Sequence, residues 1–160
     1  MLLCYDGSKA GRRALRRGAE LAILVKARVY VLSIIPEGVT DPAVMAGAGG
    51  HACLVDPSQG FCQMLEESIG WLKERGVDAH GFLATGHVTE QILAHAQRLE
   101  IDLIVLGYYP KPTGGYWWAG PQRKLSLAER AKCCILVAVE GEDSLAPLAT
   151  PPGAHASRST

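Results

Sequence analysis

The sequence predicts a single α/β domain in which a five-stranded parallel β-sheet is covered by helices on both faces. Three observations support this fold class. Apolar segments alternate with segments of helical periodicity along residues 1–140, which is the pattern of successive βαβ units. The second of these apolar segments is apolar on both faces, as buried parallel strands tend to be. A chain of 160 residues also fits one domain with one core.

The first predicted strand is "MLLCY", which ends at the turn Asp6-Gly7-Ser8. Apolar residues at helical spacing then predict the inward face of a helix: Ala14, Leu15, Gly18, Leu21, Ala22 and Val25. Four arginines fall outside this stripe, namely Arg12, Arg13, Arg16 and Arg17. They would form either an anion-binding patch or a solvated face, and we favour the solvated face. The second strand is "RVYVLSII".

Residues 36–60 contain glycine, proline and alanine without a clear period, so we expect a long irregular loop there, either a lid or disordered. A helix is predicted from about Phe61 to Arg75, ending at Gly76. A strand over "VDAHGFLAT" and a helix over "GHVTEQILAHAQRLE" follow.

The fourth strand is "DLIVLG", and the loop "GYYPKPTGGYWWAGPQ" leads from it to a helix over Gln122–Lys132. "CCILVAVE" is the fifth strand. Residues 141–160 have few apolar groups to bury, so we expect a disordered tail. In a parallel sheet of this kind, ligands bind at the carboxyl ends of the strands, near the point where the strand order reverses. Asp6, Ile34 and Gly107 are all predicted to lie at such ends.

Composition excludes several classes of partner. The 16 basic and 16 acidic residues balance, which argues against nucleic acid and anionic membrane as partners. The most apolar window is interrupted by Lys26 and Arg28 and is too short to cross a bilayer. No leader precedes the first strand, so a cytoplasmic location is expected.

The cysteines and histidines predict structural positions and no metal site. The five cysteines show no Cys-x-x-Cys pattern, and His80, His87 and His95 have no partners at ligand spacing.

Four segments in order, "LLCYDGSKAGRRALRRGAELA", "TGHVTEQIL", "IDLIVLG" and "AERAKCCILVAV", resemble the universal stress protein family over about residues 1–140. The resemblance implies a Rossmann-like fold of the adenine nucleotide α-hydrolase type. It also implies a homodimer through the last strand, about Cys133–Val139. Some members of the family bind ATP and others do not. In those that do, the matching positions here are Asp6 for the nucleotide, a backbone group at about Ile34 for the adenine, and a phosphate loop that starts at Gly107.

The phosphate loop of binders has the pattern Gly, two residues, Gly, nine residues, Gly, then Ser or Thr. Gly107 and Gly120 keep this spacing, although counting back from the last strand shifts Gly120 by one position. The second glycine is replaced by Pro110 and the Ser/Thr position by Pro121. Each proline lacks an N–H that would face a phosphate, so the loop is predicted to be degenerate. The favoured function therefore needs no nucleotide, and ATP with Mg²⁺ is the cofactor of the alternative, nucleotide-binding function.

The same loop concentrates aromatic residues, namely Tyr108, Tyr109, Tyr116, Trp117 and Trp118. Such residues are enriched at interfaces. Packing within the domain or the homodimer is the favoured use, and recognition of another protein is the alternative.

Three functions remain. The first is a non-catalytic stress-response or regulatory domain that acts as a dimer. The second is an ATP- or AMP-binding regulatory module of the same family. The third is an enzyme, a slow ATPase or another hydrolase of this fold. We place the enzyme last, because no nucleophile and base are paired in the sequence: Asp6-Gly7-Ser8 is explained as a turn and a helix cap.

Overall fold

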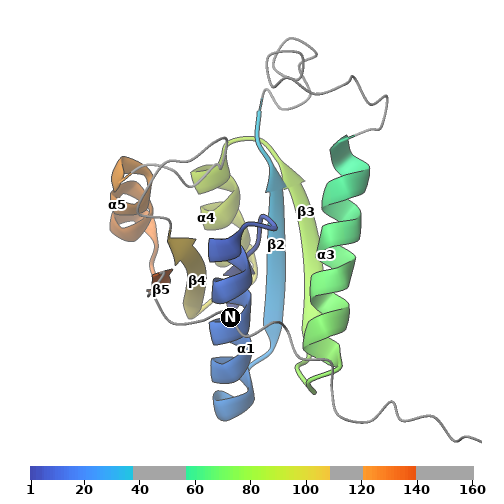
Figure 1. Cartoon of the computed structure of the whole chain (residues 1–160). Helices are drawn as coiled ribbons and strands as arrows, with labels where there is room; N and C mark the ends of the chain where they lie inside the picture. The colour runs from blue at the N-terminus through green and yellow to red at the C-terminus, as the bar shows by residue number, and fades with distance from the viewer. Residues whose placement is uncertain (38–56, 109–120, 140–160) are drawn as a thin grey trace, which may run out of the picture.

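The computed structural model describes residues 1–37, 57–108 and 121–139. Strands and helices alternate along the chain (Figure 1): β1 (Leu2–Cys4), α1 (Lys9–Val25), β2 (Val29–Ile35), α3 (Pro57–Lys73), β3 (Ala79–Thr85), α4 (Val88–Arg98), β4 (Leu103–Tyr108), α5 (Pro121–Arg130) and β5 (Cys134–Val139). Residues 38–56 of the predicted loop, most of the loop after β4 and the predicted tail lie outside the described residues.

The five strands form one sheet in the order β3-β2-β1-β4-β5, and every neighbouring pair is parallel. The chain moves outward from β1 to β2 and β3, and then crosses back to add β4 and β5 on the other side of β1. The strand order therefore reverses between β1 and β4. The predicted fold class is confirmed, and the structure adds the strand order and the position of its reversal.

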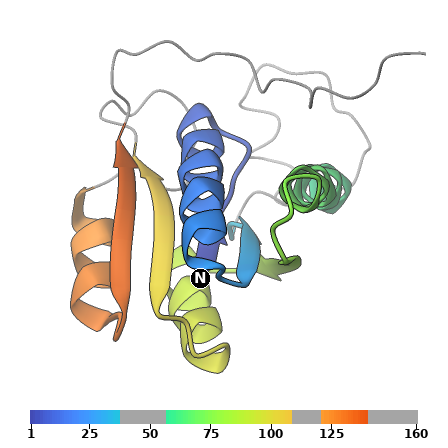
Figure 2. The same ribbon diagram turned by 90° about the horizontal axis from the view of Figure 1, so that it is seen from below.

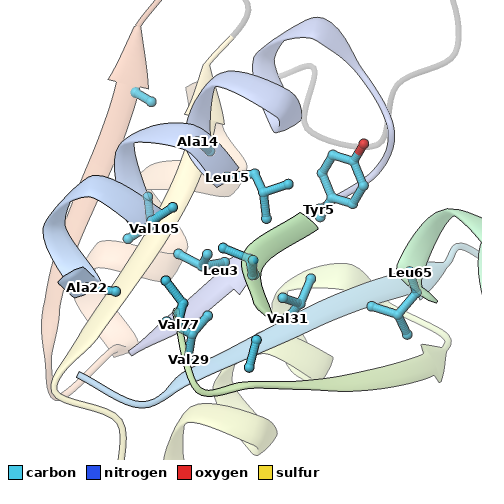
Figure 3. Packing of buried hydrophobic residues seen from close by; sticks show 14 residues of the cluster. Leu3, Tyr5, Ala14, Leu15, Ala22, Val29, Val31, Leu65, Val77 and Val105 are labelled. Carbon is cyan, nitrogen blue, oxygen red and sulfur yellow. The ribbon is translucent and has the colours of Figure 1, made fainter. Parts of the chain in front are cut away.

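Helices cover both faces of the sheet (Figure 2). On one face, α1 and α3 enclose a cluster of buried side chains around Leu3, Val31 and Val105, which Figure 3 shows at close range. On the other face, α4 and α5 enclose a second cluster that includes Ile34, Ile92 and Leu127. Because the central strands are buried on both sides, their sequences show no polar alternation.

Two details of the predicted elements are wrong. Helix α3 begins at Pro57, so residues 57–60 belong to a helix and not to the predicted loop over 36–60. Proline is well suited to the first turn of a helix, where its missing N–H has no helical partner in any case. In α1, Val25 was expected to face inward, yet 57% of it is exposed because it occupies the final position of the helix. Within the described residues, no helix is long and apolar enough to span a membrane.

Candidate functional site at the carboxyl ends of β1, β2 and β4

Two predicted residues lie where the strand order reverses. Asp6 follows β1 by two residues, and Gly107 is the last residue but one of β4, the neighbouring strand. Ile34 lies one residue before the end of β2, on the other side of β1. The fold therefore brings all three to the same edge of the sheet, at the carboxyl ends of its central strands.

Hydrogen bonds hold the turn that carries Asp6. Its Oδ1 accepts a hydrogen bond from the Ser8 N–H at 3.0 Å, and the Ser8 Oγ accepts one from the Gly11 N–H at 2.9 Å. Ser8 is the N-cap of α1, so the Asp6-Gly7-Ser8 turn provides the helix cap predicted for it. Gly7 between them has a φ of 74°, in the left-handed region that favours glycine. The turn thus fixes one carboxylate oxygen of Asp6 beneath the first turn of α1.

Ile34 contributes only its backbone to this edge. Its side chain is fully buried in the cluster under α4. Along β2, the Leu32 carbonyl accepts a hydrogen bond from the Tyr5 N–H on the β1 side. The Ile35 carbonyl accepts one from the Gly86 N–H on the β3 side. Because peptide directions alternate along a strand, the peptide groups of Ile34 point to the β1 side. The register of β1 on β2 ends at the pair Cys4 and Leu32, so these groups lie beyond the paired part of β1.

Gly107 has a structural reason to be glycine. A β-carbon built at this position would overlap the carbonyl group of Ala10 and would lie 2.8 Å from the Gly11 backbone nitrogen. The end of β4 and the first turn of α1 therefore approach each other closely, backbone against backbone. Glycine at this position serves the packing of the fold, whether or not a phosphate binds nearby.

Most of the loop between β4 and α5 lies outside the described residues. This applies to the degenerate motif position Pro110, to the retained motif glycine Gly120 and to four of the aromatics, Tyr109, Tyr116, Trp117 and Trp118. The fifth aromatic, Tyr108, is half-buried at the end of β4 and lies opposite Val139 of β5. Pro121 is the first residue of α5, the helical position to which proline is suited.

The sequence interpretation missed one contact at this edge. Arg12, assigned to a solvated face, reaches back along the chain, and its Nη1 donates a hydrogen bond to the Gly7 carbonyl oxygen. Burial raises the pKa of the neighbouring Tyr5 hydroxyl, while the charge of Arg12 and a side-chain hydrogen bond from it act in the opposite direction. Helical spacing gives no signal for this contact, because the target carbonyl belongs to a left-handed turn before the helix.

Two of the three histidines, His80 and His95, have ordinary structural partners. His80 Nε2 lies 3.1 Å from Asp78 Oδ1, and His95 Nδ1 lies 2.8 Å from the Gln91 carbonyl oxygen. Burial raises the pKa of the Cys4 thiol far above its usual value, which makes it unreactive. In the part of the chain that the structure describes, no cluster of three or more His, Cys, Asp or Glu is suited to a metal ion.

A second feature is β5, one of the two edge strands of the sheet. The exposed fractions of its Leu136, Val137 and Val139 are 38%, 38% and 57%. The Cys134 N–H donates a hydrogen bond to the Asp102 carbonyl on the β4 side. Because peptide directions alternate along a strand, the peptide groups of Ile135 and Val137 point outward, away from β4. Arg13 of α1 donates to the Val139 carbonyl oxygen at 3.1 Å, at the carboxyl end of β5. The edge strand and the Asp6 turn are thus both in contact with the first turns of α1.

Comparison with known proteins gives a consistent result. The model of the universal stress protein family matches residues 1–120. No curated protein matches the chain. Among solved structures, a universal stress protein family member from Burkholderia pseudomallei is 21% identical, with a TM-score of 0.62 over 85% of this chain and 92% of that one.

Two other similar structures contain nucleotides. A universal stress protein in complex with cAMP is 20% identical, with a TM-score of 0.61 over 85% of this chain and 93% of that one. A family member from Arabidopsis thaliana with AMP bound is 14% identical, with a TM-score of 0.60 over 88% of this chain and 91% of that one. At these identities the structural likeness shows the fold.

Proposed function

Because the chain belongs to the universal stress protein family, we propose that it is a non-catalytic regulatory domain that works as a homodimer paired through β5. The observation that carries this proposal is the open edge strand. Among the side chains that the structure describes, exposed large apolar residues occur only on β5 and at the end of α1. An apolar edge strand with unpaired peptide groups is a template for pairing with another strand.

A second copy of the chain suits this edge. An isologous contact between two β5 strands would use the same residues twice and would close after two subunits. It would satisfy the outward peptide groups of Ile135 and Val137 and cover Val139. The resemblance to the family also implies a dimer through this strand. The contact would extend the five-stranded sheet across both subunits.

The non-catalytic part of the proposal rests on how the polar groups of the turn are used. The Ser8 Oγ accepts the Gly11 N–H as a helix cap, and Ser8 is only 6% exposed. Asp6 Oδ1 is bonded to the Ser8 N–H. Neither contact activates a nucleophile, since the groups are joined to backbone donors and not to a general base.

Sedimentation velocity tests the dimer with a matched pair of variants. Val137→Lys with Val139→Lys places charge on the exposed face of β5, whereas Ile23→Lys with Val25→Lys makes the same change at the end of α1. Val139 and Val25 are both 57% exposed in the isolated subunit. We expect the wild type and the α1 variant to sediment as dimers and the β5 variant as a monomer. A monomeric wild type, or a β5 variant that stays dimeric, would contradict the proposal.

Adenine-nucleotide binding is the second candidate function, and one arrangement favours it. The Asp6 carboxylate follows the end of β1, and the peptide groups of Ile34 face the β1 side from the neighbouring strand β2. A carboxylate and unpaired peptide groups are suited to a ribose hydroxyl and an adenine ring. Relatives of the same fold contain cAMP and AMP. We place AMP ahead of ATP here, because the phosphate loop is degenerate in sequence.

The degenerate loop has a physical consequence at α5. The helix begins with Pro121, so the first of its N-terminal N–H groups is missing. Helix N-termini bind phosphate through such groups, and Pro121 also lacks the hydroxyl of the family motif. Pro110 removes another N–H from the loop itself. This argues for weak binding of a polyphosphate and leaves the adenine end of the site intact.

A further inference from the structure

Arg12 is joined to the Asp6 turn by two different groups. Its backbone N–H bonds to the Ser8 carbonyl at 2.8 Å, as the first hydrogen bond of the helix. Its guanidinium turns back beyond the start of α1 and donates to the Gly7 carbonyl. The side chain therefore contacts the residue between Asp6 and Ser8.

The guanidinium also lies beside Tyr5, the residue before Asp6. The Tyr5 ring is buried, and its oxygen points away from the cluster of aliphatic side chains (Figure 3). Burial raises the pKa of this hydroxyl, and the charge of Arg12 with a side-chain hydrogen bond from it lowers that pKa. An arginine presents several N–H donors in a rigid plane, so it is able to join two oxygen acceptors at once.

Between the hydrogen-bonded residues Asp6 and Ser8, Gly7 is the most adaptable residue of the turn. Gly7 adopts a φ of 74°, and glycine has more alternative conformations than any other residue. From α3, the Met64 sulfur occupies the space where a β-carbon of Gly7 would lie. Met64 is a flexible apolar side chain and limits the turn only by contact. The Arg12 bond is a polar restraint on the Gly7 carbonyl.

We propose that Arg12 is a positioning residue, which joins the Gly7 carbonyl to the Tyr5 hydroxyl and thereby fixes the Asp6 carboxylate for a ligand at the carboxyl edge of the sheet. The ligand part of this inference rests on the nucleotide-binding function proposed above. Arg17, one and a half turns further along α1, provides a contrast. Its guanidinium bonds to Glu20 within the same helix, and both side chains are more than half exposed.

Hydrogen exchange measured by NMR tests the positioning role without any ligand. The Ser8 and Gly11 amides report on the turn, because they donate to Asp6 Oδ1 and Ser8 Oγ. We expect Arg12→Met to speed their exchange by about tenfold, as loss of one charged hydrogen bond would, and Arg12→Lys to have a smaller effect. The Leu32 amide in the buried sheet and the variant Arg17→Met serve as controls and should not change. Unchanged exchange of Ser8 and Gly11 in Arg12→Met would overturn the inference.

Calorimetric titration of the same variants with Mg-AMP tests the ligand part. If the wild type binds AMP, Arg12→Met should weaken binding by about tenfold, Arg12→Lys by less, and Arg17→Met not at all. Equal affinity of Arg12→Met and the wild type would overturn the role in binding. A wild type that does not bind AMP would remove the nucleotide function itself, and the exchange of Ser8 and Gly11 would still decide whether Arg12 holds the turn.

Discussion

Gly107 of β4 lies against the backbone of Ala10 in α1 so closely that a β-carbon at position 107 would overlap the Ala10 carbonyl group. This contact seats the first turn of α1 beside the carboxyl end of β4, next to the Asp6 turn. It also changes the meaning of the sequence motif. The glycine that matches the start of the family's phosphate loop is required by packing, so its presence alone is no sign that phosphate binds.

Replacing Gly107 by alanine should therefore destabilise the protein by about 1–3 kcal/mol, the usual cost of forcing an atom into a well-packed core. Gly70 in α3 is the control, because a β-carbon there meets nothing within 4 Å. Gly70→Ala should leave stability unchanged or raise it by up to about 1 kcal/mol, as removal of a glycine from an exposed helix position does. Urea denaturation at one fixed protein concentration measures both, and equal stabilities of the two variants would contradict the packing argument.

The sequence predicted the parts of this molecule that depend on local pattern. Strands apolar on both faces indicated a buried parallel sheet, and the Asp6-Gly7-Ser8 turn indicated a helix cap. The last helix was predicted from Gln122, and α5 begins one residue earlier, at Pro121. The start of α3 at Pro57 was missed, because Gly60 and the absence of apolar periodicity before Phe61 were interpreted as loop.

Features that depend on contacts between distant segments were beyond the sequence. Helical spacing placed Val25 inside, but spacing does not show whether the last turn of a helix has the core beside it. The approach of Gly107 to Ala10 depends on which strand lies next to β1, and the contact of Arg12 with Gly7 depends on the path of a turn. Each of these required the strand order or the backbone conformation.

Nucleotide binding predicts a thermal shift. A ligand at a hundred times its dissociation constant adds about 2.7 kcal/mol of stability, so Mg-AMP at that excess should raise the melting temperature by several degrees. Asp6→Asn keeps an oxygen that accepts the Ser8 N–H but removes the charge. It should reduce or abolish the shift while the unliganded melting temperature stays close to that of the wild type. No shift of the wild type at millimolar Mg-AMP and Mg-ATP would exclude this function.

The degenerate loop predicts a gain of affinity. Pro110→Gly together with Pro121→Ser restores two N–H groups and one hydroxyl. Since each charged hydrogen bond contributes about 1.5–3 kcal/mol, Mg-ATP should bind roughly a hundredfold more tightly or better. Calorimetric titration with ATP and AMP measures this, and the gain should be larger for ATP. If the double variant binds ATP with the affinity of the wild type, the missing donors do not explain the departure from the family motif.

The ion pair between α4 and α5 predicts a pH dependence. Arg130 Nη2 lies 2.9 Å from Glu90 Oε2, and a second bond joins the same two groups. The hydrogen bond from Arg130 lowers the pKa of Glu90 below its ordinary value of 4.5. A carboxyl whose pKa is lowered by folding adds stability above its unfolded pKa, and this stability is lost as pH falls through the folded pKa.

The variant Arg130→Gln should therefore be less stable than the wild type at pH 7. The difference should be small, because both groups are exposed. The difference should vanish in melts well below pH 4.5, and a difference that persists there would assign the effect to packing.

Hydrogen exchange along β5 tests the homodimer most directly. The peptide groups of Ile135 and Val137 point away from β4, whereas that of Leu136 points toward it. Strand pairing between two subunits should therefore protect the Ile135 and Val137 amides at high protein concentration, and dilution should release them while Leu136 stays protected. If Ile135 and Val137 exchange as fast as exposed amides at every concentration, while Leu136 remains protected, β5 is a free edge and the proposed dimer does not form.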